Sequence, residues 1–463
     1  MSKYNKDSSI IIIGSGVFGL STAYNLSNEG YRNITIFDKT DLYSLSYLGG
    51  NTASSDLNKV FREFYESKDH YHKLAIESRK IFEKWDQDLQ NLKNSELNEK
   101  LTRLKIIDDC GLIRLDSEIT DYELNNLETF SKSGLRDTQF VLDDLQDIKR
   151  ANQQGWGHKL DLFPSLKYKG VLDSTSGIIY ASRACTYVQY VLRSRGVKFI
   201  TGSEAGQVKQ ILEDDNGEVK GISTFDGKHH YSDLVILAAG PWSAKLLPQL
   251  TRLSEGQSGN VIHLKVPQVI SLQAKYSPEN FPILLWKVNP KYRSGIGIFP
   301  ITKPEGIMKI IVLQPKFRNP TPVNDQQAPS IPLHDESRLT KVIITKVKQF
   351  IQEFFPDLIE HGVKISKTEV LWYTDVINND FIIDWVPNKS NLIIMTGGSG
   401  HGFKFLPNLG KFVVNLLHGD VNNQYNQIFK WRNPEIYEDV NGIRDNDRVL
   451  SEQEFASIED LQL

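Results

Sequence analysis

The sequence predicts an α/β fold (α+β overall) built on a Rossmann-type, doubly wound sheet, and three observations lead to this prediction. Residues 10–13 are four consecutive isoleucines, which is the uncharged pattern that a buried parallel strand requires. Residues 14–19 read Gly-Ser-Gly-Val-Phe-Gly, a spacing that allows a tight turn and close approach of the backbone to a pyrophosphate. A helix expected over 20–29 and a strand over 34–37 then lead to Asp38, whose carboxylate can accept hydrogen bonds from ribose hydroxyls. Strand, glycines, helix, strand and acid in this order predict a dinucleotide site.

Length and composition indicate a globular protein of more than one domain. At 463 residues the chain is too long for one ordinary core. A hydrophobic content of 40% and a charged content of 24% are typical of soluble domains. The formal charge of −3 gives no reason to expect nucleic acid or an anionic membrane as a partner, and no apolar run is long enough to span a bilayer.

Cysteine usage and the last residues bear on the compartment. Only Cys110 and Cys185 occur, which argues for a reducing compartment and against a disulfide framework. The chain ends in Leu-Gln-Leu, which is not a peroxisomal address of the serine-lysine-leucine type. We therefore expect a cytoplasmic protein, with a peroxisomal location left open through another signal.

Apolar patterns farther along the chain continue to alternate between helices and strands. Helices are expected over 71–92 and 184–195. Strands are expected at 104–107, 112–115, 197–201, 207–212, 219–224, 234–242, 261–273, 296–313 and 391–396. Those at 261–273 and 296–313 alternate like members of a second, mixed sheet. From about residue 433 the tail is rich in acidic residues, and we expect it to wrap the surface or to be partly disordered.

Three separated segments resemble one family of enzymes. They are the glycine turn with Asp38, the strand end Ala-Ala-Gly-Pro-Trp at 238–242, and Gly-Ser-Gly-His-Gly-Phe-Lys-Phe at 398–405. Together they look like the flavin-dependent amine oxidases of the monomeric sarcosine oxidase family, over most of the chain. The segments 398–411, 176–181 and 431–434 look most similar to the fungal fructosyl amino acid oxidases, or amadoriases.

The resemblance implies a cofactor, a domain arrangement and a reaction. The cofactor would be FAD, held in a doubly wound domain of the glutathione-reductase and D-amino-acid-oxidase type formed by residues 1–100, 168–245 and 376–432. A mixed-sheet substrate domain would comprise 101–167 and 246–375, followed by the acidic tail 433–463. The family oxidises the C–N bond of a secondary amine, commonly an N-substituted amino acid. The resulting imine hydrolyses, and oxygen is reduced to hydrogen peroxide.

Lys309 is the residue expected to serve oxygen. In the family the matching lysine faces the flavin, where a fixed cation stabilises the negative charge that develops on oxygen. By strand period Lys309 shares a face with Ile307 and Ile311. A lysine open to water is the competing interpretation, and the apolar neighbours favour the catalytic one.

Three more charged residues are implied by the same resemblance. Lys59 and Arg62 lie in a segment, 56–62, that we expect to be a loop leading into a helix. The family places a basic residue such as Lys59 beside the flavin, where it is a catalytic candidate. Arg62 and Lys404 are the expected partners of a substrate carboxylate. The guanidinium of Arg62 can pair with it bidentately, and Lys404 would be the second partner. The competing interpretation for Lys59 and Arg62 is an ordinary charged helix face.

Tyr373 matches a tyrosine that walls the substrate pocket over the flavin, so we treat it as both a catalytic and a substrate-binding candidate. A half-buried sheet aromatic is the alternative. His401 lies in a loop whose backbone is expected to bind the flavin, and we do not expect it to be catalytic. The cofactor-binding residues that the resemblance implies are Gly14, Ser15, Gly16, Val17, Phe18, Gly19, Asp38, Lys39, Ser54, Ser55, Asn58, Lys59, Val208, Ala239, Gly240, Trp242, Gly400, His401, Gly402, Phe403 and Lys404.

No cluster of His, Cys, Asp and Glu has metal-ligand spacing, so no metal is expected. The expected partners are a small amino acid substrate and oxygen, and the expected state is a monomer.

The sequence departs from the family pattern at two positions. Most members attach FAD through a cysteine where this chain has Leu371, so we expect non-covalent FAD. The fructosyl amino acid oxidases have a substrate-contacting glutamate four residues after the oxygen-activating lysine, where this chain has Leu313. A leucine cannot accept hydrogen bonds from a sugar, and a buried unmet donor typically costs ~1–3 kcal/mol.

The second departure weakens the fructosyl interpretation and favours sarcosine-like N-alkyl amino acids, pipecolate or saccharopine. The first hypothesis remains an FAD-dependent oxidase of secondary amino acids that resembles fructosyl amino acid oxidase and has a fructosyl amino acid-like substrate. A dehydrogenase with another electron acceptor and a non-catalytic FAD-binding protein are the other hypotheses.

Overall fold

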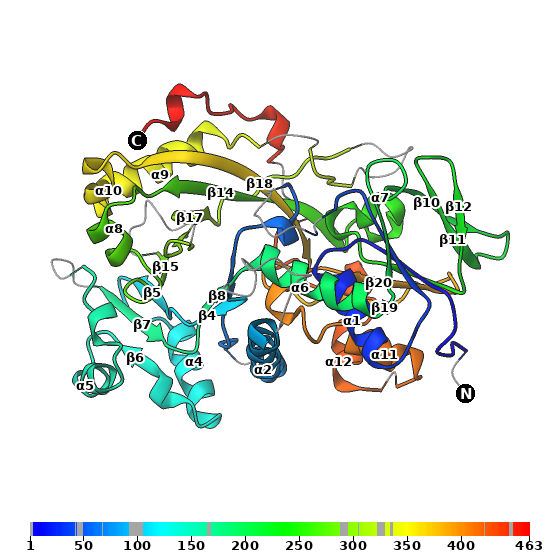
Figure 1. Cartoon of the computed structure of the whole chain (residues 1–463), viewed down its shortest axis with the longest axis horizontal. Helices are drawn as coiled ribbons and strands as arrows, with labels where there is room; N and C mark the ends of the chain where they lie inside the picture. Colours follow the sequence, from blue (N-terminus) through cyan, green and yellow to red (C-terminus); the bar gives the residue numbers. More distant parts are fainter. Residues whose placement is uncertain are drawn as a thin grey trace.

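Two large sheets form the framework of the protein, which we describe from a computed structural model (Figure 1). The structure describes residues 3–41, 43, 50–66, 68–91, 105–163, 168–287, 295–303, 305–321, 329–333, 337–420, 422–443 and 448–463. One sheet has six strands and the other has eight. No helix within these ranges is long and apolar enough to cross a membrane.

The six-stranded sheet confirms the predicted α/β fold. Its strands, in spatial order, are β19 (Ile382–Trp385), β20 (Leu392–Thr396), β13 (Leu234–Leu237), β1 (Ile10–Ile13), β2 (Ile34–Asp38) and β9 (Lys198–Thr201). All neighbours run parallel except the β19–β20 pair at the edge. Alternate isoleucines of β1 enter two different apolar clusters, so both faces of the sheet are buried.

Three helices lie together at this end of the molecule, α1 (Val17–Asn28), α6 (Ala181–Ser194) and α11 (Lys411–Leu417), with α1 contacting the other two (Figure 1). Helix α1 begins at Val17 rather than at residue 20 as predicted, because the glycine turn itself supplies the first helical residues.

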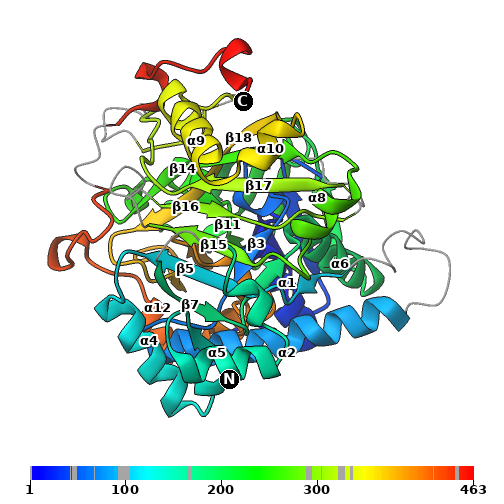
Figure 2. The ribbon, with the colours of Figure 1, turned by 90° about the vertical axis from the view of Figure 1, so that its left-hand side faces the viewer.

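The eight-stranded sheet is mixed, as predicted. Its order is β18 (Lys364–Val376), β14 (Ser254–Lys265), β17 (Ile307–Val312), β16 (Ile296–Ile298), β15 (Ile283–Trp286), β5 (Leu112–Asp116), β7 (Lys169–Asp173) and β6 (Gln139–Val141). Only β15 and β5 pair in parallel. Figure 2 shows β14, β17, β16, β15, β5 and β7 in succession, with α9 (Lys341–Phe354) beside them. Side chains of α9 share an apolar cluster with this sheet.

Three predicted strands were too long. The stretch 234–242 is a strand only as far as Leu237, where β13 ends, and residues 240–242 form a short 3-10 helix that contains Pro241. The stretch 261–273 divides into the end of β14 and helix α8 (Ile270–Lys275), because Pro267 between them has no N–H to continue the ladder. The stretch 296–313 divides into β16 and β17, which are joined by a turn that ends at Gly306 with φ +61°.

The expectation of a helix beginning in 56–62 was wrong. The segment contains β3 (Lys59–Phe61), which pairs with β8 (Gly177–Ile179); β4 (Ile107–Asp108) completes a small sheet. The β-branched and aromatic residues Val60 and Phe61 suit a half-buried strand. The predicted strand over 104–107 is reduced to β4, and Leu104 lies outside the described residues.

The remaining elements complete the two halves of the molecule. They are α2 (Asp69–Asn91), α4 (Asp121–Lys132), α5 (Leu145–Gln153), β10 (Val208–Glu213), β11 (Val219–Thr224), β12 (His229–Tyr231), α7 (Ser243–Leu246), α10 (Pro356–Glu360) and α12 (Gln424–Phe429). In the tail, Val449 and Phe455 form bridges with Arg318 and Thr340, so the described part packs beside α9 (Figure 2). The predicted domain boundaries remain a prediction.

Candidate functional site

A cavity of about 520 Å³ lies between the two sheets and is lined by both. The six-stranded sheet contributes residues at or just after the ends of β1, β2 and β13, which include Gly14, Asp38 and Ala239. The eight-stranded sheet contributes Lys309 from β17 and Tyr373 from β18. The cavity therefore lies at the carboxyl ends of parallel strands, where ligands bind in open α/β sheets.

The glycine turn leaves no space for side chains. Gly14 has φ +105°, and a Cβ atom there would lie 2.4 Å from the carbonyl oxygen of Ala238. A Cβ atom on Gly19 would lie 1.9 Å from the carbonyl oxygen of Gly14. Asp38 accepts hydrogen bonds from the backbone N–H (2.6 Å) and the hydroxyl (2.9 Å) of Ser15, which fixes its carboxylate beside the turn. The start of α1 and Asp38 thus face the same end of the cavity.

Lys309 is buried in the middle of β17, with 1% of its side chain exposed. Its ammonium lies 2.8 Å from a carboxylate oxygen of Asp56, 2.5 Å from the carbonyl oxygen of Asn58 and 4.3 Å from the ring centre of Phe299. Burial lowers the pKa of Lys309 to about 8, although the negative charge of Asp56 opposes the change. The lysine is therefore held as a partly desolvated cation at the cavity wall.

Asp56 joins two lysines. The same carboxylate oxygen that contacts Lys309 also lies 2.6 Å from the ammonium of Lys59. Burial alone would raise the pKa of Asp56, but the charges of Lys309 and Lys59 lower it to about 2. Behind Lys309, His263 of β14 and Glu369 of β18 form a second buried pair, with 3.4 Å between nitrogen and oxygen.

Arg62 and Lys404 line the cavity and have no carboxylate within 4 Å among the residues that the structure describes. Arg62 donates to the carbonyl oxygen of Phe64 (2.5 Å), and its guanidinium lies 4.6 Å from the ring centres of both Phe64 and Tyr65. Lys404 is 2% exposed and donates to the hydroxyl of Tyr65 (2.9 Å) and to the carbonyl oxygen of His401 (3.2 Å). Burial, and then the charge of Arg62, lowers the pKa of Lys404 well below its ordinary value.

Other buried cations of the cavity are compensated. Arg114 is held by Glu123, with both carboxylate oxygens 2.8 Å from its Nε, and Lys309 is held by Asp56. Burying a charge without a counter-ion is costly. Arg62 and Lys404 thus create a place for an anionic group of a ligand.

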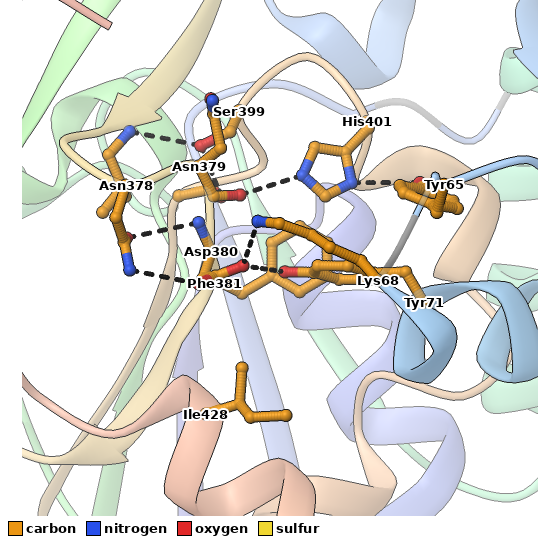
Figure 3. A network of polar contacts seen from close by, with 12 residues as sticks. Tyr65, Lys68, Tyr71, Asn378, Asn379, Asp380, Phe381, Ser399, His401 and Ile428 are labelled. Atoms are coloured by element: carbon orange, nitrogen blue, oxygen red, sulfur yellow. Dashed lines mark hydrogen bonds and ion pairs between the residues drawn. The ribbon is translucent and has the colours of Figure 1, made fainter. Parts of the chain in front are cut away.

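His401 belongs to a polar network beside this place (Figure 3). Its Nδ1 lies 3.1 Å from the Tyr65 hydroxyl, and its Nε2 lies 3.0 Å from the carbonyl oxygen of Asn379. Asp380 accepts hydrogen bonds from Lys68 and Tyr71, each at 3.1 Å. Burial, and then the charge of Lys404, lowers the pKa of His401 well below its ordinary value, so the ring is neutral.

Three further cavity residues bear on the ligand. Tyr373 lines the cavity, and the ammonium of Lys316 lies 5.5 Å from its ring centre. Leu371 is buried in the wall and has no atom that can form a thioether to a cofactor. Leu313 also lines the cavity and is 42% exposed.

Most residues predicted for the site come together around this one cavity. Those that line it are Gly14, Gly16, Val17, Phe18, Asp38, Lys39, Ser54, Lys59, Arg62, Val208, Ala239, Gly240, Trp242, Lys309, Tyr373, Gly400, His401, Gly402, Phe403 and Lys404. Four predicted residues lie behind the lining and contact the residues that form it: Ser15, Gly19, Ser55 and Asn58.

Two residues at the site, Asp56 and Tyr65, were not predicted from the sequence. Asp56 precedes Lys59 by three residues, and this spacing of opposite charges was an available signal. Tyr65 follows Arg62 by three residues, but nothing in the sequence indicates that its hydroxyl meets Lys404, 339 residues later.

The doubly wound sheet carries a glycine turn at the end of its first strand, and the mixed sheet lines the same cavity. This arrangement is typical of enzymes that bind a dinucleotide on one sheet and a substrate under the other. Residues 9–416 match the family described as FAD dependent oxidoreductase. The chain belongs to this family and is therefore an FAD-dependent oxidoreductase.

Relatives with assigned activities match nearly the whole chain. L-saccharopine oxidase of Schizosaccharomyces pombe is 26% identical over 91% of this chain and 93% of its own length. Peroxisomal sarcosine oxidase of Homo sapiens is 24% identical over 88% of this chain and 91% of its own.

Solved structures of amadoriases share the fold. Fructosamine oxidase (Amadoriase II) from Aspergillus fumigatus in complex with FSA has a TM-score of 0.70 and 25% identity, covering 93% of this chain and 91% of that one. A modified fructosyl peptide oxidase from Aspergillus nidulans has a TM-score of 0.76 and 24% identity, and the match covers 97% of this chain and 99% of that one. These similarities agree with the family resemblance seen in the sequence.

The described residues fit an FAD. Gly14 and Gly19 let the turn pack directly against the backbone of Ala238 and of Gly14 itself, and the N–H groups at the start of α1 suit a pyrophosphate. The hydroxyl of Thr374, in the cavity wall, and both polar atoms of the Asn58 side chain are buried and have no hydrogen-bond partner within the described part of the chain. Unpartnered buried polar atoms are expected where a polar ligand completes the set.

Proposed function

We propose that the protein oxidises the C–N bond of a secondary amino acid that carries a free carboxylate, with oxygen as the electron acceptor. The observation that carries this proposal is the pair Arg62 and Lys404, two cations at one cavity that lack a carboxylate partner among the described residues. An α-carboxylate bound between them would supply the missing negative charge.

When bound, FAD would take up one hydride equivalent, which carries two electrons, from the carbon next to nitrogen and would later pass these two electrons to oxygen. Gly14, the start of α1 and Asp38 would hold its dinucleotide part, and Lys59 would lie beside its ring. The imine product would add water and separate into a carbonyl compound and an amine, while oxygen and two protons would give hydrogen peroxide. If the amine binds neutral, no side chain is required to act as a strong base.

Lys309 would serve the oxygen half-reaction. Its ammonium is buried and positioned by Asp56 and the Asn58 carbonyl, and it can stabilise negative charge that develops on oxygen. Tyr373 would wall the substrate part of the cavity, which its place in the lining supports.

The side chain at position 313 bears on the choice between two candidate substrate types. A fructosyl amino acid is one candidate, supported by the structural similarity to fructosamine oxidase. Saccharopine is the second, because Leu313 offers no hydrogen-bond acceptor to a sugar hydroxyl and a 26% identical relative is an L-saccharopine oxidase. Leu313 favours saccharopine.

The test follows the absorbance of the oxidised flavin in the purified holoenzyme without oxygen. Fructosyl-valine, fructosyl-lysine, sarcosine, pipecolate and saccharopine are added in turn. Bleaching by one of these amines supports the proposed chemistry and identifies the substrate type. A flavin that none of them bleaches would contradict the proposal, and rapid bleaching followed by slow reoxidation in air would indicate another electron acceptor.

A further inference from the structure

We propose that Tyr65 is a positioning residue that organises both cations of the carboxylate site, through its hydroxyl to Lys404 and through its ring to Arg62. This inference rests on the proposed function, because it presumes that Arg62 and Lys404 bind a carboxylate. Tyr65 itself lies behind the cavity lining and is buried, so it acts through the two cations.

The direction of each hydrogen bond at Tyr65 follows from its partners (Figure 3). The carbonyl oxygen of Asn379 can only accept, so the proton of the neutral His401 ring resides on Nε2, 3.0 Å away. His401 Nδ1 is then an acceptor, and the Tyr65 hydroxyl, 3.1 Å away, donates to it. The hydroxyl oxygen is left to accept from the ammonium of Lys404 at 2.9 Å.

This chain of hydrogen bonds gives His401 a function other than catalysis. A neutral His401 with its proton on Nε2 orients the Tyr65 hydroxyl so that its lone pairs face Lys404. A charged His401 would offer a second donor at Nδ1 and would disrupt that orientation. Burial keeps the ring neutral, since it lowers the pKa of His401 well below its ordinary value.

The ring of Tyr65 acts on the other cation. The guanidinium carbon of Arg62 lies 4.6 Å from its centre, within the range of a cation–π contact. Tyr65 also stacks on Tyr71 of α2, with 5.0 Å between ring centres and 26° between planes. The stack holds the Tyr65 ring in place beneath Arg62.

The groups that face the Lys404 ammonium are few. Tyr65 and Arg62 approach it from the segment after β3, and His401 approaches it from its own loop through its carbonyl oxygen. Helix α2 contributes the hydroxyl of Ser78, which donates to the Lys404 carbonyl oxygen. Tyr65 and the His401 carbonyl are thus the only acceptors of the Lys404 ammonium among the residues that the structure describes.

The test measures anion binding in the holoenzyme, with benzoate and its uncharged counterpart benzamide as probes and the flavin absorbance as the signal. Tyr65→Phe removes one oxygen atom and keeps the ring. We expect it to bind benzoate about tenfold more weakly, in line with loss of a hydrogen bond to a charged group, and to bind benzamide as the wild type does. The pH above which benzoate affinity declines should also move downward, because Lys404 loses an acceptor that stabilises its charged form.

Tyr71→Phe is the matched control, since its hydroxyl contacts Asp380 and not Lys404. We expect it to behave as the wild type with both probes. Tyr65→Leu, which also removes the contact with Arg62, should bind benzoate still more weakly than Tyr65→Phe.

Equal benzoate affinity and equal pH dependence in Tyr65→Phe and Tyr71→Phe would overturn the inference while the carboxylate site itself stands. A wild-type enzyme that binds benzoate no better than benzamide would overturn the carboxylate site, and this inference with it. The two failures are therefore distinguishable.

Discussion

Replacement of Asp56 with asparagine tests how the fold sets the charge of Lys309. The side chain keeps its shape and one acceptor oxygen, but it loses the negative charge that lies 2.8 Å from the Lys309 ammonium. The wild-type pKa of Lys309 is about 8, the result of burial opposed by Asp56. An opposite charge this close typically raises the pKa of a lysine by about one to three units. In Asp56→Asn we therefore expect the Lys309 pKa at or below neutrality.

The consequence is a shift in the pH dependence of flavin reoxidation. The ammonium is present below its pKa and is lost above it, so the wild-type rate should decline as the pH rises through about 8. In Asp56→Asn the decline should occur about one to three pH units lower, with the rate at low pH preserved. The other charged groups around Lys309 are Lys59 and Glu369; His263 also faces it but is neutral, because burial lowers its pKa to about 4, and the substitution leaves all three in place.

The assay reduces the flavin of the holoenzyme chemically without oxygen and mixes it with aerated buffer at a series of pH values. Asp375→Asn is the control, because it breaks a different buried lysine–aspartate pair, Lys316–Asp375, in which 2.6 Å separates nitrogen and oxygen. We expect the control to keep the wild-type pH dependence. The same midpoint in Asp56→Asn and wild type, or a uniform loss of rate at every pH, would refute the reasoning.

Three more predictions concern single residues. Lys309→Met should slow flavin reoxidation and spare reduction by the amine, as stopped-flow absorbance would show; equal losses in both half-reactions would exclude an oxygen role. Because Leu371 stands at the attachment position, acid precipitation should release all flavin into the supernatant, and flavin retained on the precipitated chain would contradict this. Burial, and then the charge of Asp173, raises the pKa of Glu63 from 4.5 to about 7, so the folded state retains a proton that the unfolded chain releases and stability falls as the pH rises between these values. Glu63→Gln should therefore raise the thermal midpoint above pH 7 and change it little below pH 4.5, and an equal effect at both would be inconsistent with this account.

The parts of the fold that the sequence predicts well are governed by local patterns. The strand 10–13 follows from an uncharged run of isoleucines. The glycine turn is equally local, because Gly14 has φ +105°, a conformation that favours glycine, and the turn in its sequence context pointed to the acid at Asp38. The family resemblance identified Lys309, its apolar neighbours at strand spacing favoured a buried position, and β17 does bury it.

What the sequence did not predict depends on distant partners. Strand β3 has only three residues, and its structure is decided by pairing with β8, more than a hundred residues later. Asp56 and Lys309 are 253 positions apart, so their ion pair has no local signature. The role of Tyr65 depends on His401 and Lys404, which a different loop brings to it.

The most direct test of the account is the rate of anaerobic flavin reduction by the best amine from the panel and by its carboxamide, in which the carboxylate is replaced by an uncharged amide. We predict that the acid reduces the flavin with saturation at low concentration and that the amide requires at least about a hundredfold more, because Arg62 and Lys404 would have no anion to pair with. Equal concentration dependence for the acid and the amide would contradict the central claim that these two cations select the substrate.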